Sequence, residues 1–295
     1  MKQTALVMAV LLSGSIAMAQ KSFTELVNLK KLDKIISLDV PAGKVGKDGM
    51  GIVPDLAKRP VKKVALVSFY LDDLGKSEGK FIGLTEDGGN KIATEFYNES
   101  LGDIKSSFQK NGIEVMIIES VLNSAEKKEG YENFELSMTK VMHAMVSYAE
   151  RWKYEGIPMA TAPAGYRMLP TTIVPADYGV SKSMGELTDL LEVDAVLVAV
   201  VQTRTSTKST TFIKTGLSMH GPNPTPKTPG KKYPGKSYNT GMHYGSVMVK
   251  VEKEFEFILR KKGNVISQDY TGYGEVMGKI SSKLAEHIAL QSAGN

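Results

Sequence analysis

The sequence predicts an α/β protein in which a mixed sheet is flanked by helices, with the order β-α-β-α-α-β-β-β-α. Three observations predict this class. Two apolar runs rich in β-branched residues, at 64–71 and 195–201, are typical of strands buried on both faces. Stretches with apolar residues at helical spacing lie between them. Residues 247–259 alternate between apolar and charged side chains, as in a strand with one wet face.

The first half of this order begins with the strand at 64–71. Residues 90–110 carry an apolar stripe and predict an amphipathic helix, which ends at Asn111-Gly112. The next strand starts at Ile113. Residues 132–152 predict a second long helix, whose methionine stripe is interpreted as core packing.

In the second half, a short helix at 181–191 leads into the strand at 195–201. Past a basic loop, the strand at 247–259 turns at 260–264 into a hairpin, and a last helix follows with apolar residues from Met277 to Ile288. We therefore expect one α/β domain at 61–291, with a projecting loop at 203–245. Residues 20–60 are expected to be an N-terminal arm or linker containing a short amphipathic helix.

The N-terminus has the pattern of a secretion signal. Lys2 precedes an apolar run at 5–12, and Ala17-Met18-Ala19 forms a small-residue cleavage site, which predicts a signal peptide at 1–19 that is cleaved after Ala19. We expect an exported bacterial protein that is periplasmic or associated with the outer membrane. The chain contains no cysteine, which excludes disulfides, thiol nucleophiles, cysteine metal sites and lipid attachment at an N-terminal cysteine.

The positive charge of the chain is concentrated in one stretch. The net charge is +5, and it is +4 once Lys2 is removed with the signal. Residues 202–249 contain seven Lys or Arg residues and no Asp or Glu, so the rest of the mature chain is net negative. Within this stretch, residues 221–236 hold five of the twelve prolines and four lysines. Proline and mutual lysine repulsion predict a loop that projects.

We interpret this stretch as a binding site for an anionic partner, either an anionic envelope polymer or an acidic envelope protein. Lysines would pair with anions, and interleaved tyrosines, Tyr244 included, would stack on sugars or planar groups. Nucleic acid has matching chemistry but is not expected for an exported protein. A homo-oligomer and a peripheral contact with the outer membrane are compatible with the sequence. The candidate binding residues are Lys227, Lys231, Lys232, Tyr233, Lys236, Tyr238, Arg204, Lys208 and Lys214.

Catalytic and metal chemistry have weaker support. Asp72 and Asp73 follow the first strand and, with Glu86 and Asp87, form a candidate acidic site. His220 and His243 flank the proline- and lysine-rich loop and would approach each other if its ends formed a ladder. A metal site there would need a third ligand, and no carboxylate lies in the segment. No nucleophile elbow, HExxH or phosphate-binding loop occurs, so we expect no catalytic residue, metal or cofactor.

One set of motifs resembles known envelope proteins. The strings VKKVALVSF, VMIIES, MGELTDLLEVDAVLVAVV and FEFILRKKGNVISQDYTGYG, with a closing helix, are similar to a fold shared by three groups. These are the CsgG-like curli secretion channel family, the lipoprotein activators of penicillin-binding proteins, and the N-terminal domain of TolB. The similarity covers roughly residues 61–291 and implies no active-site residues. The chain departs from the first two groups in lacking an anchoring cysteine, and its segment at 203–245 is longer and more basic.

The sequence therefore predicts a non-enzymatic envelope binding or assembly factor that acts through its basic segment. One alternative is a subunit of an outer-membrane secretion or pore assembly, in which residues 203–215 and 243–253 would span the membrane. The other is an envelope hydrolase that uses the acidic residues after the first strand.

Overall fold

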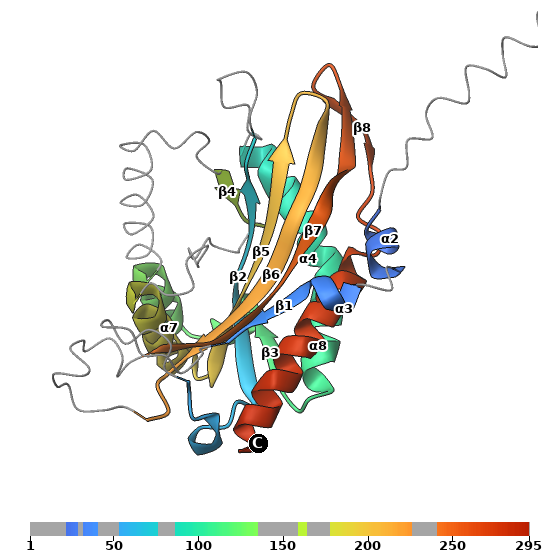
Figure 1. The fold of residues 1–295 in the computed structure, drawn as a ribbon. Coiled ribbons are helices and arrows are strands. Elements are labelled where there is room, and N and C mark those ends of the chain that lie inside the picture. Colours follow the sequence, from blue (N-terminus) through green and yellow to red (C-terminus); the bar gives the residue numbers. More distant parts are fainter. Residues whose placement is uncertain are drawn as a thin grey trace, which may run out of the picture.

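A computed structural model describes residues 22–28, 32–40, 53–75, 86–134, 159–163, 178–225 and 241–294. Eight strands form one sheet in the order β1-β7-β6-β5-β2-β3, with β4 paired to β2 and β8 paired to β7 (Figure 1). Strand β2 runs parallel to β3 and β5, and the other pairs are antiparallel. In chain order the elements are α2 (Phe23–Asn28), α3 (Leu32–Ile35), β1 (Ile36–Asp39), η1 (Leu56–Lys58), β2 (Lys63–Asp73), α4 (Glu86–Gln109), β3 (Glu114–Ile117), α5 (Ile118–Val121), β4 (Met159–Thr161), α7 (Tyr178–Leu191), β5 (Ala195–Thr205), β6 (Ser209–Gly221), β7 (Met242–Lys261), β8 (Asn264–Gln268) and α8 (Tyr273–Ser292).

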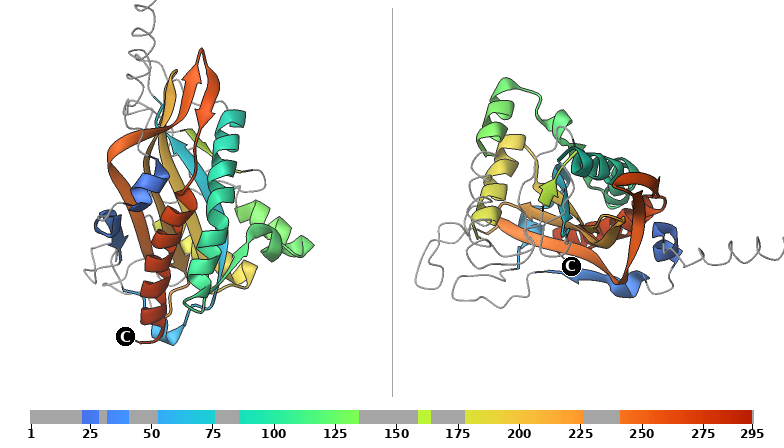
Figure 2. Two further views of the ribbon diagram at one scale, coloured as in Figure 1. Left: turned by 90° about the vertical axis from the view of Figure 1, so that its right-hand side faces the viewer. Right: turned by 90° about the horizontal axis from the view of Figure 1, so that it is seen from above.

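Helices cover both faces of the sheet, with α4 and α8 on one face and α7 on the other (Figure 2). We call the face toward α4 and α8 the inner face and the opposite one the outer face. Thr215 of β6 marks the inner face, because its hydroxyl lies 2.9 Å from the Tyr273 hydroxyl of α8. Successive strand residues point to opposite faces, so this contact assigns the faces of the neighbouring strands through their registers.

The predicted fold class is confirmed, and its central strands are β2 and β5. Ten of the eleven residues of β2 are buried, as expected for a strand with helices on both faces. The helices predicted at 90–110, 181–191 and 277–288 correspond to α4, α7 and α8. Residues 125–134 are helical. The rest of the second long helix, like the predicted signal peptide, lies outside the described residues.

The expected projecting loop at 203–245 is wrong at both ends. Strand β5 continues to Thr205, β6 occupies Ser209–Gly221, and β7 begins at Met242. Eleven of the thirteen residues of β6 are buried, among them Phe212, Leu217 and Met219. Several of the buried residues are polar, Thr210, Thr215 and His220 among them, which is why this strand has the composition of a loop.

The expected arm or linker at 20–60 is also wrong for the residues described there. The short helix predicted in it is confirmed as α2 and α3, but β1 joins the sheet by pairing with β7. Phe23 of α2 is fully buried, and its ring centroid lies 5.0–5.8 Å from five other aromatic rings. These rings belong to Phe96, Phe212, Phe255, Phe257 and Tyr273. The segment before the first predicted strand therefore completes the core of the domain.

We expect Phe23→Ala to lower the free energy of unfolding by about 3–5 kcal/mol, because it leaves a cavity at the centre of the aromatic cluster. Urea unfolding measures the loss. Glu25→Ala, at an exposed position of the same helix, is the control and should change stability by less than about 0.5 kcal/mol. If Phe23→Ala changed the free energy of unfolding as little as Glu25→Ala, the Phe23 side chain would not stabilise the core.

Candidate binding site at the base of the basic segment

The basic segment, residues 222–241, joins the ends of two hydrogen-bonded strands. The β6–β7 ladder continues through His220 opposite His243 to Gly221 opposite Met242, after a bulge that follows Met219. We call residues 220–223 and 242–244 the neck. Because both sides of the neck belong to one ladder, the segment leaves and re-enters the sheet at adjacent points.

Tyr244 holds the two sides of the neck together. Its side chain is 1 % exposed, and its hydroxyl donates a hydrogen bond of 2.5 Å to the Pro222 carbonyl oxygen. Burial raises the pKa of Tyr244, which keeps the phenol protonated as a donor. A Cβ atom at Gly221 would lie 2.5 Å from this hydroxyl, so the position requires glycine. The expectation that Tyr244 stacks on a ligand is therefore wrong.

Asn223 sets the direction in which the chain leaves the neck. Its Oδ1 accepts a hydrogen bond of 2.9 Å from the Thr225 amide, which closes an Asx turn. Pro222 and Pro224 restrict the backbone on either side of this nearly buried residue. The structural roles of Gly221 and Asn223 were not predicted, although the Gly-Pro-Asn-Pro string is itself a turn signal.

His220 and His243 face each other across the ladder, as predicted for paired loop ends. Their ring centroids are 5.1 Å apart, and Nδ1 of His220 and Nε2 of His243 are buried without a hydrogen-bond partner. Burial, reinforced by His243, lowers the pKa of His220 well below its usual value; burial also lowers the pKa of His243, against the attraction of Asp39. Within the described ranges, no three His, Cys, Asp or Glu side chains are grouped to hold a metal ion.

The lowered pKa values predict that the protein loses stability in mild acid. Below about pH 6.5 the unfolded chain binds protons that these buried imidazoles do not accept, so the free energy of unfolding falls as the pH drops. In His220→Phe, we expect a smaller loss of stability between pH 7.5 and pH 5 than in the unmodified protein, as measured by urea unfolding. His287→Phe is the comparison: burial lowers the pKa of this half-buried histidine less than that of His220, so its replacement should reduce the loss by less. An unchanged pH dependence in His220→Phe would contradict this assignment.

The structure separates the candidate binding residues into different regions. Lys227, Lys231, Lys232, Tyr233, Lys236 and Tyr238 lie outside the described residues. Arg204 and Lys208 lie near the other end of β6, which is thirteen residues long, or about 40 Å. Arg204 forms an ion pair of 2.5 Å with Glu254. The positive charge of Lys214 favours the ionised form of the buried Asp72. Arg204, Lys208 and Lys214 therefore do not belong to the neck.

Asp72 and Asp73 are buried residues at the end of β2, which corrects the expectation that they follow this strand. As neighbours in a strand they point to opposite faces of the sheet. Asp72 accepts a hydrogen bond of 2.6 Å from Gln202, and Asp73 accepts one of 2.9 Å from the Thr203 hydroxyl. Two carboxylates on opposite faces cannot flank one reacting atom, so they do not form an acid/base pair.

The environment of Asp72 leads to a stability prediction. Burial raises the pKa of Asp72, although the hydrogen bond from Gln202 and the charge of Lys214 oppose the shift. A raised pKa means that ionisation at neutral pH opposes folding. We expect Asp72→Asn to increase the free energy of unfolding at pH 7 but not at about pH 3, where the carboxyl group is protonated. Exposed Asp87→Asn is the control, and a less stable Asp72→Asn variant at pH 7 would refute this reading.

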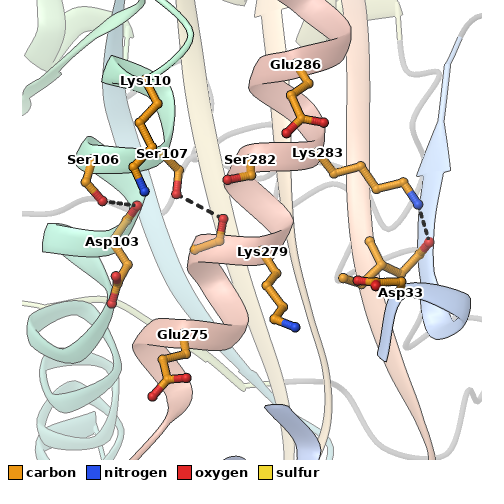
Figure 3. Close-up of a pocket in the computed structure, with 12 residues that line it drawn as sticks. Asp33, Asp103, Ser106, Ser107, Lys110, Glu275, Lys279, Ser282, Lys283 and Glu286 are labelled. Carbon is orange, nitrogen blue, oxygen red and sulfur yellow. Dashed lines mark hydrogen bonds between the residues drawn. The ribbon is translucent and has the colours of Figure 1, made fainter. Parts of the chain in front are cut away.

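A groove of about 530 Å³ runs over the solvent side of α8, between α4 and the α3–β1 region (Figure 3). Lys283 donates a hydrogen bond of 2.9 Å to the Ile36 carbonyl, and the Ser107 hydroxyl donates one of 3.0 Å to the Gly278 carbonyl. The groove carries both signs of charge and so favours neither anions nor cations. Its charged lining residues are Asp33, Asp103, Lys110, Glu275, Lys279, Lys283 and Glu286.

Comparison with protein-family models, curated proteins and solved structures finds no match for this chain. In the part of the chain that the structure describes, no helix is both long and apolar enough to span a membrane. The neck is the part of the described structure from which the lysine-rich, carboxylate-free segment starts. It is therefore the candidate functional site.

Proposed function

We propose that this protein is a non-enzymatic binding or assembly factor of the bacterial cell envelope, and that its basic segment holds an anionic partner. The partner is an anionic envelope polymer or an acidic envelope protein. The observation that carries the proposal is made at the neck. A stretch with four lysines and no carboxylate starts there from two paired strands with buried ends. A ligand bound to the segment would therefore be attached to the rigid core of the sheet.

The chemistry of the segment supports an anionic partner. Lysines pair with anions with a strength that falls as salt rises, and tyrosines between them add flat surfaces for stacking. The proposed set is smaller than the sequence alone suggested, because Arg204, Lys208 and Lys214 lie away from the neck. It consists of Lys227, Lys231, Lys232, Tyr233, Lys236 and Tyr238.

One further point favours the envelope, and another favours binding over catalysis. The predicted signal peptide and the resemblance to CsgG-like, penicillin-binding-protein activator and TolB N-terminal domains support an exported protein in the periplasm or at the outer membrane. The opposite orientations of Asp72 and Asp73 and the mixed charges of the α8 groove offer little basis for an enzyme site.

The proposal is tested by replacing Lys227, Lys231, Lys232 and Lys236 together with Gln and measuring retention on immobilised dextran sulfate over a salt gradient. Exposed ion pairs contribute roughly 0.2–1 kcal/mol each, so we expect binding weaker by about 1–4 kcal/mol and elution at lower salt. We expect little change in thermal stability, because Gln keeps a long polar side chain at each position.

The matched control replaces four exposed lysines elsewhere, Lys91, Lys128, Lys250 and Lys253, with Gln. It alters the net charge equally. If both variants lose retention to the same extent, total charge explains the binding and the basic segment has no special role. Protease treatment of envelope extracts before a pull-down distinguishes the partner classes, because capture of a polymer survives it.

A further inference from the structure

Two hairpin turns lie side by side at the end of the sheet opposite the neck, beyond the helices (Figures 1 and 2). One joins β5 to β6 and the other joins β7 to β8. They are in contact, because the Arg260 amide donates a hydrogen bond of 2.6 Å to the Lys208 carbonyl oxygen. We call residues 204–209 and 260–267 the sheet tip.

Both turns have a fixed geometry. Lys262 and Gly263 have φ values of 53° and 84°, the left-handed conformation that a two-residue type I′ turn needs at both central positions. In the other turn, the Ser206 amide donates to the Ser209 carbonyl at 2.8 Å. The Ser206 hydroxyl in turn accepts from the Ser209 amide at 3.0 Å. A partner therefore meets a preorganised surface.

The tip exposes two neighbouring apolar side chains. Val265 is 50 % and Ile266 is 60 % exposed, and only two other large hydrophobic residues of the described chain, Val53 and Leu290, are as exposed. Every residue from Lys261 to Asp269 is exposed. Among the described strands, β8 pairs only with β7.

A bulge in β8 disfavours the pairing of a second β-strand with this edge. The β7–β8 ladder pairs Leu259 with Ser267 and Arg260 with Val265, which leaves Ile266 without an opposite residue. Bulges of this kind twist an edge strand and oppose strand addition. Val265 and Ile266 therefore form a projecting apolar pair rather than an edge that a second copy could extend.

The same tip carries cationic side chains and no carboxylate. Residues 203–211 and 258–268 contain five Lys or Arg residues and no Asp or Glu. Arg204 is paired with Glu254, and the guanidinium of Arg260 donates to the Thr210 hydroxyl. Lys208, Lys261 and Lys262 remain exposed, with no carboxylate of the described residues in ion-pair distance.

We propose that the sheet tip docks on an anionic lipid surface. Val265 and Ile266 enter the boundary between headgroups and acyl chains, and Lys208, Lys261 and Lys262 pair with lipid phosphates. The exposed β-branched residues suit the acyl-chain layer, and the lysines beside them suit the headgroup layer. A purely polar partner would offer no surface for the apolar residues. The proposal does not depend on the function of the basic segment, because that segment leaves the sheet at the other end.

Flotation with vesicles of equimolar phosphatidylglycerol and phosphatidylcholine tests the docking. We expect binding to these vesicles and none to pure phosphatidylcholine. A variant with Val265→Ser and Ile266→Ser should bind about tenfold more weakly or worse. A variant with Lys208→Gln, Lys261→Gln and Lys262→Gln should show a similar loss at low salt. In Ile266→Trp, the indole emission should shift to the blue when anionic vesicles are added.

Two controls make the test specific to the tip. Leu290→Ser removes an equally exposed apolar side chain from α8, and the four-lysine variant removes charge from the basic segment. Both variants should bind vesicles as the unmodified protein does. The proposal is overturned if the unmodified protein ignores anionic vesicles, or if the double serine variant binds them normally. It is also overturned if the basic-segment variant is the one that loses binding, or if the tip substitutions abolish self-association in a protein that does not bind vesicles.

Discussion

The antiparallel ladder between β6 and β7 is the constraint on which the other features depend. It runs from Ser209 opposite Leu259 to Gly221 opposite Met242 and so defines both ends of the molecule. At one end it brings His220 and His243 together and gives the basic segment a rigid base. At the other it aligns the β5–β6 and β7–β8 turns. Because antiparallel register fixes every opposing residue, a shift by one position would exchange the inner and outer faces of β6 and disrupt both ends together.

The length of β7 also explains the role of the N-terminal residues. Its twenty residues pair with β6 along one edge, whereas β1 and β8 occupy separate parts of the other edge. The inner face between those parts carries Phe255 and Phe257, which need apolar cover. Phe23 supplies it from α2 by contacting rings of two strands and two helices at once. The Thr24 hydroxyl donates to the Thr271 carbonyl oxygen near the start of α8. The short helix α2 is therefore held in place by the buried side chains of Phe23 and Leu26 and by this hydrogen bond.

The sequence was informative where the buried positions are apolar and misleading where buried positions are occupied by polar residues. Strands β2 and β5 are predictable because two covered faces demand unbroken apolar runs, and α4 and α8 because their stripes repeat every turn. Strand β6 was missed because Thr210 and Thr215 occupy buried inner positions in a polar segment, a choice that local composition does not reveal. Asp72 and Asp73 were placed in a loop because two adjacent carboxylates rarely end a buried strand. The neck was foreseen only as a conditional pairing of two histidines, since Tyr244 closes it through a contact with Pro222 that depends on strand register.

The distribution of charge gives the two ends of the sheet independent chemistry. The neck and the sheet tip are both free of carboxylates, yet the length of β6 separates them by about 40 Å. Screening at physiological salt acts over about 8 Å, so charges at one end have little effect on ligands at the other. Between them, Glu254 and the buried Asp72 and Asp73 balance the cations within the sheet. A lipid surface at the tip would therefore leave the neck accessible at the far end of a rigid sheet, where an anionic partner could bind without competing for the same lysines.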